Sequence, residues 1–340
     1  MPVLDARRFL LLAALFAVVP DTARSADSAA VFLYHRFGED AHPSTSIKVD
    51  QFAAQVQELA SGGYTVLSLE EIATRIRSGA GVPDRTVGLS IDDAYRSAYD
   101  VAWPILRRAN MTFTVFVSTD SIGGKDMMSW DQLRELKRAG ITVGGHTASH
   151  AHMPVLSLER NRAELEKSKR VQEKELGEAP RIFAYPYGEY VLALRPLITE
   201  FGYTIAFGEH SGVMGPKSDF LFLPRFVMNE TYGEIGRFKL AARSLALPVS
   251  DVTPTDPLIG SKTNPPALGF TVDPSAGALD SLRCFADGQK VDLHKLGERR
   301  VELRVERPYP PGRVRINCTL PVDGGKTYRW FGTQFYVTRN

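Results

Sequence analysis

Between about residue 30 and residue 245, short runs of β-branched and apolar residues alternate with stretches of helical periodicity. This order predicts repeated βα units and a mainly parallel sheet, because parallel strands need a crossover connection that is usually a helix. The expected strands are residues 31–35, 87–91, 112–118, 141–145, 181–185, 204–207 and 221–227. About seven such units could close into a barrel, but a flat doubly wound sheet has the same local pattern. Periodicity therefore predicts an α/β fold and leaves barrel and open sheet as alternatives.

Two of the intervening helices have explicit boundary signals. Ser129 and Gln132 form a capping box, in which both side chains satisfy free N–H groups at a helix start, and Gly140 ends that helix. A second helix is expected from Asp50, because apolar residues recur at spacings of four and three: Phe52, Val56 and Leu59.

The pattern changes after an α/β domain over residues 29–247. Residues 248–266 contain five prolines among Ser, Thr and Asp and have no regular periodicity, which predicts a linker. Residues 267–340 then alternate apolar and polar positions at 301–306, 314–318 and 328–337, separated by Pro-Pro-Gly and Asp-Gly-Gly turns. We expect this part to form a small all-β sandwich similar to immunoglobulin-like domains.

The N-terminus predicts export. Arg7 and Arg8 precede an apolar run at residues 9–19, and Ala23 and Ser25 offer small residues for cleavage, so residues 1–25 are expected to be a signal peptide. The alternative is a membrane anchor, but the run is about 11 residues long, whereas a spanning helix needs roughly 20. We expect a mature protein without a transmembrane segment, located in the periplasm or secreted.

The cysteine content and the charge fit this location. Cys284 and Cys318 are the two cysteines of the chain, and a bridge between them is expected in an oxidising compartment, with two buried thiols as the alternative. The net charge is +2, and it is +1 without residues 1–25, which hold three Arg and two Asp. This balance gives no reason to expect nucleic acid as a partner.

An aspartate pair follows one of the expected strands directly. In the segment Ser-Ile-Asp-Asp-Ala-Tyr, Asp92 and Asp93 stand where parallel folds place their functional sites, at the end of a strand. Taken alone, the pair has a simpler interpretation, in which Asp93 caps the next helix and Asp92 is a solvated turn residue. The pair by itself is therefore weak evidence.

A histidine pair follows another strand end. His146 and His150 are four residues apart, so on one helical turn they can face the same metal, while His152 fits that spacing less well. Together with one carboxylate of the aspartate pair, they would form a two-His, one-Asp set with an open fourth position. That composition is typical of catalytic zinc sites, and it leaves the second carboxylate free to act as a base.

The third segment, Ala184-Tyr-Pro-Tyr-Gly188, also follows a strand. With it, the three segments resemble the motifs of the polysaccharide deacetylases of carbohydrate esterase family 4, which have the NodB-homology fold. That family has a Thr-Phe-Asp-Asp-Gly-like motif, a His-Ser/Thr-x-x-His motif and an Arg-Pro-Pro-Tyr-Gly-like motif, in this order. The resemblance covers roughly residues 29–245 and implies a distorted (β/α) barrel.

The resemblance also implies roles for the motif residues. Asp92 would be the general base, and the backbone amide of Tyr187 would contribute to the oxyanion hole. One divalent metal is implied, zinc first, although Co²⁺, Ni²⁺ and Fe²⁺ suit the same ligands. Its ligands would be Asp93, His146 and His150.

The sequence departs from the family pattern at two points. Ala184 stands where the third motif usually has an arginine that orients the base, and Arg225 is the candidate to replace it, with an ordinary structural arginine as the alternative. The late Leu-x-His motif that supplies the catalytic acid is also missing. Instead, Leu33-Tyr-His-Arg36 on the first strand resembles the branch that deacetylates poly-N-acetylglucosamine, which makes His35 the candidate acid and His210 a weaker rival.

Aromatic residues near these segments could stack on sugar rings or belong to the core; these are Tyr95, Trp130, Tyr185 and Tyr190. In the C-terminal part, an interpretation as sandwich core is preferred for Trp330, Phe331, Phe335 and Tyr336.

The function predicted from the sequence is hydrolysis of N-acetyl groups on an N-acetylated polysaccharide or on peptidoglycan. An O-acetyl esterase on the same scaffold and a non-catalytic glycan-binding protein are the alternatives.

Overall fold

The computed structural model describes residues 25–339 with the exception of residue 288. The signal peptide expected for residues 1–25 therefore lies outside the described residues, apart from its last position. Within the described part of the chain, no helix is both long enough and apolar enough to cross a bilayer.

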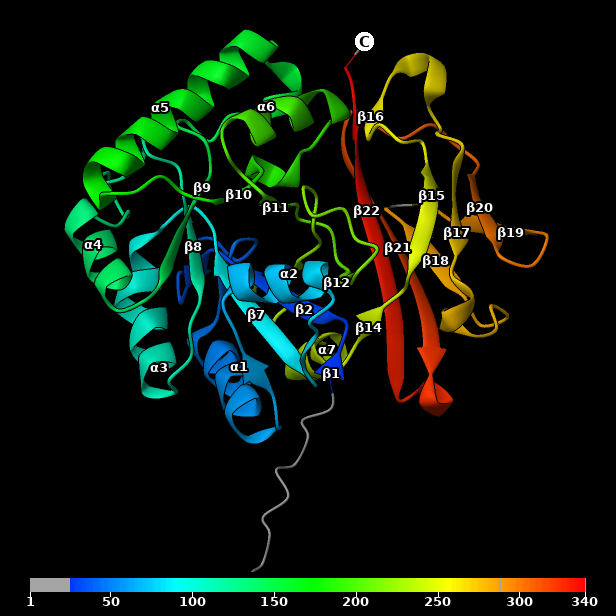
Figure 1. The fold of residues 1–340 in the computed structure, drawn as a ribbon, viewed down its shortest axis with the longest axis horizontal. Helices are drawn as coiled ribbons and strands as arrows, with labels where there is room; N and C mark the ends of the chain where they lie inside the picture. The colour runs from blue at the N-terminus through cyan, green and yellow to red at the C-terminus, as the bar shows by residue number, and fades with distance from the viewer. Residues whose placement is uncertain (1–24, 288, 340) are drawn as a thin grey trace, which may run out of the picture.

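A mainly parallel sheet forms the centre of the first two thirds of the chain (Figure 1). Its strands lie side by side in the order β11, β10, β9, β8, β7, β2 and β12, and only β12 at the edge of this series is antiparallel to its neighbour. Their bounds are Ile205–Phe207 for β11, Ile182–Ala184 for β10, Thr142–Gly145 for β9, Thr114–Val117 for β8, Thr86–Ile91 for β7, Ala29–Tyr34 for β2 and Val213–Met214 for β12. Six of the seven strands expected from periodicity are present, and the α/β class is confirmed.

The sheet curls into a half-barrel, and one segment spans the space between its two ends. Leu223 forms a parallel bridge with Phe207 of β11, and β13(Phe226–Val227) then pairs with β2. The strand expected at residues 221–227 is thus shortened to β13. Pro224 explains the interruption, because proline has no N–H to donate to a neighbouring strand.

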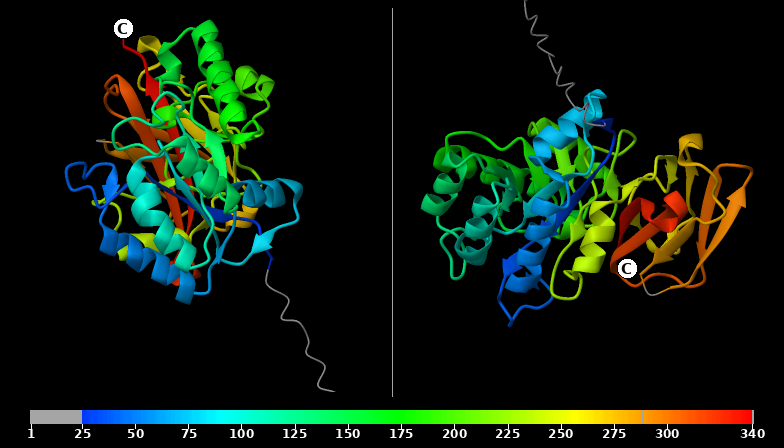
Figure 2. Two further views of the ribbon diagram at one scale, coloured as in Figure 1. Left: turned by 90° about the vertical axis from the view of Figure 1, so that its left-hand side faces the viewer. Right: turned by 90° about the horizontal axis from the view of Figure 1, so that it is seen from below.

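Helices pack on the outer face of this sheet and at one opening of the curl (Figures 1 and 2). Their bounds are Val49–Ser61 for α1, Leu69–Ser78 for α2, Trp103–Arg108 for α3, Trp130–Arg138 for α4, Leu158–Leu176 for α5, Arg195–Glu200 for α6 and Ile235–Ala242 for α7. The capping box is confirmed at the start of α4: the Gln132 amide N–H donates to Ser129 Oγ at 3.2 Å, and the Ser129 amide N–H donates to Gln132 Oε1 at 2.8 Å.

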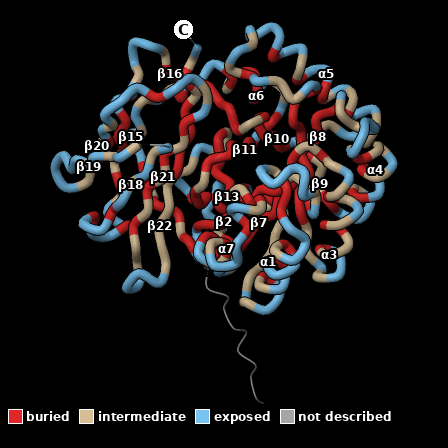
Figure 3. Tube along the Cα trace, turned by 180° about the vertical axis from the view of Figure 1, so that it is seen from behind, coloured by how far each residue is buried: buried red, intermediate tan, exposed pale blue. Residues whose placement is uncertain are grey.

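Strand β2 shows why the sheet lies at the centre. All six of its residues are buried, which is typical of a parallel strand covered on both faces. Phe32 and Tyr34 contribute to the core beneath α1 and α7, and Val31 contributes to a separate core beneath α2. Figure 3 shows the buried strands inside and the exposed helix surfaces outside.

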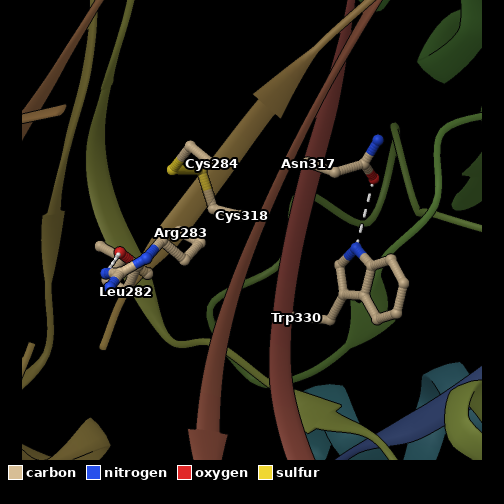
Figure 4. The surroundings of a disulfide bond; sticks show 6 residues. All are labelled: Leu282, Arg283, Cys284, Asn317, Cys318 and Trp330. Carbon is tan, nitrogen blue, oxygen red and sulfur yellow. Dashed lines mark hydrogen bonds between the residues drawn. A yellow bond between two sulfur atoms is a disulfide. The ribbon is translucent and has the colours of Figure 1, made fainter. Parts of the chain in front are cut away.

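The C-terminal β region, residues 245–339 without residue 288, consists of two sheets that share one apolar core. One sheet has the order β15, β17, β20, β19, with bounds Val249–Thr253, Leu268–Val272, Arg300–Val305 and Val291–Leu296. The other has the order β14, β22, β21, β18, with bounds Leu245–Ala246, Thr327–Val337, Gly312–Val322 and Arg283–Ala286, and β16(Leu258–Ile259) also pairs with β22. The disulfide between Cys284 and Cys318 is confirmed and links β18 to β21 (Figure 4).

The prolines of residues 248–266 predicted a linker, but this segment is not a plain linker. They contain β15, which pairs with β17, and β16, which pairs with β22. Both are edge strands, so Pro254 and Pro257 can lie beside them without breaking a hydrogen-bonded ladder. Most side chains of β15 are exposed or half-buried, which is why the alternation of a half-buried strand is missing from the sequence.

Two pairs of short strands lie outside these sheets: β1(Ser25–Ala26) with β6(Val82–Pro83), and β3(Arg36–Phe37) with β4(Ser46–Ile47). The short strand β5(Thr65–Val66) extends the central sheet beside β7.

Candidate active site

The three motif segments meet at one edge of the curled sheet. Asp92 follows the last residue of β7, His146 follows the last residue of β9, and the turn Pro186-Tyr187-Gly188 follows β10. Because these strands are parallel and lie close together in the sheet, their carboxyl ends converge. Residues up to about 100 positions apart in the sequence thus form one site.

Asp93, His146 and His150 converge as a possible metal-binding set. Asp93 Oδ1 lies 3.5 Å from His146 Nε2 and 3.2 Å from His150 Nε2, and the three ligand atoms all lie within 4.8 Å of one another. His146 Nδ1 contacts the carbonyl oxygen of Ala184 at 2.7 Å, which orients the ring so that Nε2 points into the site. One carboxylate oxygen and two imidazole nitrogens suit a divalent metal such as zinc.

The electrostatics of Asp93 and His150 favour the protonation states that bind metal. Burial opposes the charged form of Asp93, but the hydrogen bond from His146 and the nearby His35 hold the pKa of Asp93 well below its usual value. Burial, together with the neighbouring His146, lowers the pKa of His150 to about 4. Asp93 is therefore charged and His150 neutral near pH 7, as metal ligation requires. His146 differs: burial lowers its pKa, but Asp93 and Asp92 outweigh burial and raise it, so a metal would have to displace a proton from this ring.

Backbone strain is concentrated in the three motif turns. Non-glycine residues with positive φ angles occur there at Asp93 (70°), Ala94 (61°), Thr147 (62°), His150 (57°) and Tyr187 (59°). Such conformations cost of order 1–3 kcal/mol each, and they persist where the surrounding structure imposes them. In this chain they direct side chains of all three turns toward one place.

Asp92 is held by Arg225. Arg225 Nη1 donates to Asp92 Oδ1 at 2.7 Å and Nη2 donates to Oδ2 at 2.8 Å, and both side chains are completely buried. The same guanidinium donates from Nε to the Gly208 carbonyl oxygen at 2.9 Å and from Nη1 to Ser90 Oγ at 3.2 Å. This bidentate contact fixes the plane of the carboxylate next to the possible metal-binding set.

His35, at the end of β2, faces Glu209 across the site. Its Nε2 lies 3.8 Å from Glu209 Oε1, and Asp92 is close to both. Burial lowers the pKa of His35, but Glu209 and the site aspartates outweigh this effect and raise it to about 9. Burial raises the pKa of Glu209, but His35 and the neighbouring arginines lower it to about 2. The pair therefore favours a protonated imidazole at neutral pH.

His210, the rival candidate for the acid, lies elsewhere. Its ring packs against Phe222 at 4.5 Å and lines a separate cavity of about 480 Å³ at the junction with the C-terminal β region. Burial lowers the pKa of His210 to about 3, and Arg315 and Arg225 add to the effect. At neutral pH this ring is uncharged and therefore a weak acid, and it does not line the cleft that includes Asp93 and His150.

The turn at Tyr187 is fixed by groups from both parts of the chain. Gly188 has φ +67°, and a Cβ at this position would lie 2.3 Å from the backbone nitrogen of Glu209, so only glycine fits. Arg313 Nη1 and Gln334 Nε2 donate to the Tyr187 carbonyl oxygen at 3.2 Å and 3.3 Å. The Tyr187 ring stacks on His152, with centroids 3.9 Å apart, and meets His150 edge-on at 4.4 Å.

Several residues of the site were not anticipated from the sequence: Glu209, Arg313, Arg315 and Gln334. Arg313 Nη1 and Arg315 Nη2 lie 3.3 Å and 3.6 Å from Glu209 Oε2, and Arg315 Nε donates to the Glu209 carbonyl oxygen at 3.0 Å. In the sequence, both arginines occupy polar positions of an alternating strand, a pattern that ordinarily indicates a solvent-facing side chain. Their role depends on the α/β region covering that face.

The aromatic residues considered from the sequence divide between core and cleft. Tyr185 and Tyr190 belong to a buried cluster, and Trp130 packs against the main core, whereas Tyr95 lines the cleft. In the C-terminal β region, Phe331 and Phe335 belong to or pack on the shared core, as expected, and Tyr336 is half-buried. Trp330 differs: it faces the α/β region, where its ring meets Phe226 edge-on at 5.0 Å.

These residues open into one large cleft between the α/β region and the C-terminal β region. The cleft has a volume of about 990 Å³ and includes Asp93, His150, His35 and Tyr187 on one side. The opposite side is formed by residues of β18, β21 and β22. The site therefore lies at the interface between the α/β region and the C-terminal β region.

The segment that carries the motif turns matches a known family. Residues 79–206, which include the aspartate pair, both histidines and the Pro-Tyr-Gly turn, match the polysaccharide deacetylase family. This chain therefore carries a polysaccharide deacetylase domain, of the type found in carbohydrate esterase family 4.

Individual relatives agree with this assignment. YxkH of Bacillus subtilis, a protein named as a polysaccharide deacetylase, is 26% identical over 160 residues, which are 47% of this chain and 57% of YxkH, so the match spans little more than half of that relative. The poly-beta-1,6-N-acetyl-D-glucosamine N-deacetylase of Staphylococcus aureus strain MSSA476 is 24% identical over 217 residues, 58% of this chain and 73% of that protein. The structure of IcaB from Ammonifex degensii is 25% identical, with a TM-score of 0.57, and the match covers 65% of this chain and 99% of that chain.

Proposed function

We propose that this protein is a metal-dependent hydrolase that removes N-acetyl groups from an N-acetylated amino-sugar polymer. The observation that carries the proposal is the convergence of Asp93, His146 and His150 beside Asp92, whose carboxylate is fixed by Arg225. A metal-binding set with a separate, oriented carboxylate suits hydrolysis of an amide, which needs both an electrophile and a base.

Asp93, His146 and His150 would hold one divalent ion, with zinc as the first candidate. When bound, the ion supplies a Lewis acid for the acetamide oxygen and lowers the pKa of a coordinated water. His146 is oriented for this role by its contact with Ala184, as ligand histidines usually are by a second partner.

The protein's own groups would handle the protons. Asp92 takes a proton from the attacking water, and Arg225 keeps its carboxylate in the required plane. Tyr187 presents its backbone N–H to the developing oxyanion from a left-handed turn whose carbonyl is held by Arg313 and Gln334. His35, which favours its protonated form beside Glu209, donates a proton to the leaving amine.

Two arguments support an amino-sugar polymer as the substrate. The Staphylococcus aureus relative is named for its action on poly-beta-1,6-N-acetyl-D-glucosamine, and Leu33-Tyr-His-Arg36, which places the candidate acid after β2, resembles the branch with that activity. The cleft of about 990 Å³ also lies at the upper end of the usual range for ligand pockets, roughly 300–1,000 Å³. An O-acetyl esterase uses the same machinery and is the second candidate, whereas a purely glycan-binding protein has no need of the oriented Asp92.

We further propose that the mature protein acts outside the cytoplasm, in the periplasm or as a secreted protein, with a C-terminal immunoglobulin-like sandwich. The disulfide between Cys284 and Cys318 supports this location, because such bonds persist in oxidising compartments.

The test is acetate release by the purified chain after zinc or cobalt is added, with free amines counted in parallel. Equal amounts of acetate and amine from oligomers of N-acetylglucosamine would support N-deacetylation. Acetate without amine from an O-acetylated glycan would favour the esterase. No acetate from either substrate or from peptidoglycan fragments would disprove the hydrolase proposal.

A further inference from the structure

One face of the C-terminal β region is turned toward the possible metal-binding set. Strand β21 alternates strictly: Val314, Ile316, Cys318 and Leu320 are buried in the shared core. The side chains between them point the other way, and those of Arg313, Arg315, Asn317 and Thr319 line the cleft. Figure 4 shows Asn317 and Trp330 on the side of the sheet opposite the disulfide. This face is polar, yet it faces the α/β region.

The side chains of this face align across the strands. Phe285 of β18 stands opposite Asn317 of β21, and Trp330 of β22 stands opposite Thr319. Trp330 Nε1 donates to Asn317 Oδ1 at 3.2 Å, so the oxygen of Asn317 is engaged and its amide nitrogen keeps N–H groups for a ligand. We name Phe285, Arg315, Asn317, Thr319 and Trp330 the β21 wall.

The β21 wall is continuous with the site. The same cleft contains His35, Asp93 and His150 at one end and the wall residues along its other side. A ligand whose acetyl group reaches Asp93 therefore has further units against β21. A cleft of about 990 Å³ exceeds what one sugar ring fills, since whole drug-sized ligands occupy pockets of roughly 300–1,000 Å³.

The chemistry of the wall fits a sugar chain. Phe285 keeps 60% of its surface exposed in the cleft lining, and an exposed aromatic ring provides a flat apolar surface for the C–H face of a sugar. The amide of Asn317 and the hydroxyl of Thr319 offer hydrogen bonds to sugar hydroxyl or acetamide groups. An apolar surface with a few placed polar groups is the usual composition of a ligand site.

The charges of the wall favour a neutral ligand. Arg315 lies 3.6 Å from Glu209, and its backbone N–H donates to Asp287 Oδ2 at 3.0 Å. Arg313, beside the wall, lies 3.3 Å from Glu209 and 3.9 Å from Glu189. Both guanidinium groups thus have a carboxylate beside them, which weakens the attraction of this face for an anionic polymer.

We propose that the β21 wall binds the sugar units next to the one being deacetylated, so that the C-terminal β region sets the preference of the enzyme for long, neutral chains of N-acetylated hexosamine. This proposal rests on the proposed function of the site. It assigns Phe285 as the stacking surface and Asn317 as a hydrogen-bond donor to the bound chain.

The experiment compares kcat/KM for a disaccharide and a pentasaccharide of N-acetylglucosamine. For the native protein with metal, the pentasaccharide should be the better substrate. In Phe285→Ala, the ratio of the two values should fall about tenfold, equivalent to roughly 1.4 kcal/mol. Phe285→Tyr keeps the ring and should retain most of the ratio, and Asn317→Ala should lower it.

Leu296→Ala is the matched control. Leu296 is an exposed apolar residue on β19, in the other sheet of the C-terminal β region, and it does not line the cleft. Its substitution should leave the ratio unchanged. Thermal unfolding of each variant checks that Phe285→Ala does not act through loss of folding, because Phe285 adjoins the disulfide at Cys284.

The proposal would be overturned if Phe285→Ala and Asn317→Ala both kept the same ratio of pentasaccharide kcat/KM to disaccharide kcat/KM as the native protein. So would a change from dimer to monomer in Phe285→Ala, because the wall would then be an interface between two copies of this chain. If the native protein releases no acetate from any substrate, binding of the same oligosaccharides by calorimetry still decides the question. Tighter binding of the pentasaccharide that Phe285→Ala abolishes would support the wall, and equal binding by both proteins would refute it.

Discussion

Arg225 binds both carboxylate oxygens of Asp92, at 2.7 Å and 2.8 Å, although the two residues are 133 positions apart in the sequence. Related deacetylases are expected to have an arginine in the third motif, where this chain has Ala184. Arg225 comes instead from the segment that spans the two ends of the half-barrel, and it reaches Asp92 through the buried interior between Phe116 and Phe207.

The first prediction concerns this pair. Arg225→Lys keeps the charge but cannot hold both oxygens of Asp92, so kcat should fall about 100-fold through misplacement of the base. Arg225→Ala leaves a buried, unpaired carboxylate and should lower the free energy of unfolding by about 3–5 kcal/mol. Acetate release and urea denaturation measure the two effects. Arg138→Lys, at an exposed position of α4, is the control, and full activity in Arg225→Lys would refute a positioning role.

The second prediction separates the base from the metal ligands. Asp92→Asn should retain the bound metal and lose activity about 10²- to 10⁴-fold, because the amide cannot accept the proton. His146→Ala should lose the metal as well as the activity, because one of three ligands is gone. Metal content by elemental analysis, with activity measured on the same samples, distinguishes the two variants. Equal loss of metal from both would show that Asp92 is itself a ligand.

The third prediction concerns pH. Glu209 contributes to the raised pKa of His35, about 9, so removing the carboxylate in Glu209→Gln should lower that pKa. His35 then loses its proton at a lower pH, and the alkaline limb of the kcat–pH profile should shift to lower pH. An unchanged alkaline limb in Glu209→Gln would contradict the assignment of His35 as the acid.

The fourth prediction concerns the contact between the two parts of the chain. A Cβ at Gly332 of β22 would lie 1.9 Å from the carbonyl oxygen of Ser211, so Gly332→Ala must push β22 away from the loop that carries Glu209. We expect a loss of about 1–3 kcal/mol in stability from overpacking and reduced activity with the metal retained. Gly260→Ala is the control, because a Cβ there meets nothing within 4 Å. Normal activity in Gly332→Ala would mean that the contact has no effect on the site.

The fifth prediction concerns the disulfide. The bond closes a segment of 34 residues, for which chain entropy predicts a contribution of about 4 kcal/mol. Replacing Cys284 and Cys318 together with Ala should lower the unfolding midpoint in urea, while the metal content of the site should stay the same. An unchanged midpoint would show that the C-terminal β region does not depend on the bond.

The local features of the fold could be predicted from the sequence. Six of the seven strands expected before residue 230, the capping box of α4 and the bridge between Cys284 and Cys318 are present as expected. The strands and the capping box depend on signals within a few residues. The bridge could be predicted because the chain has two cysteines, which allow one pairing. The convergence of the motif turns followed from the same pattern, because the carboxyl ends of neighbouring parallel strands meet at one edge of the sheet.

Other features depended on contacts between distant segments. The strands in residues 248–266 form through pairing with β17 and β22 at sheet edges, which the sequence of the segment does not encode by itself. The alternating pattern of β21 predicts that Arg313 and Arg315 face water. Their contacts with Glu209 exist because the α/β region packs against that face.

The sequence by itself determined the chemistry that is present: an aspartate pair, a histidine pair and a Pro-Tyr-Gly turn, each at the end of a strand. Only the tertiary structure decided which groups surround them, namely Arg225 on Asp92, Glu209 beside His35, and the face of β21 across the cleft. The physical reason is that periodicity and capping are interactions between near neighbours in the chain. The partner of a buried charge is set by how remote segments pack.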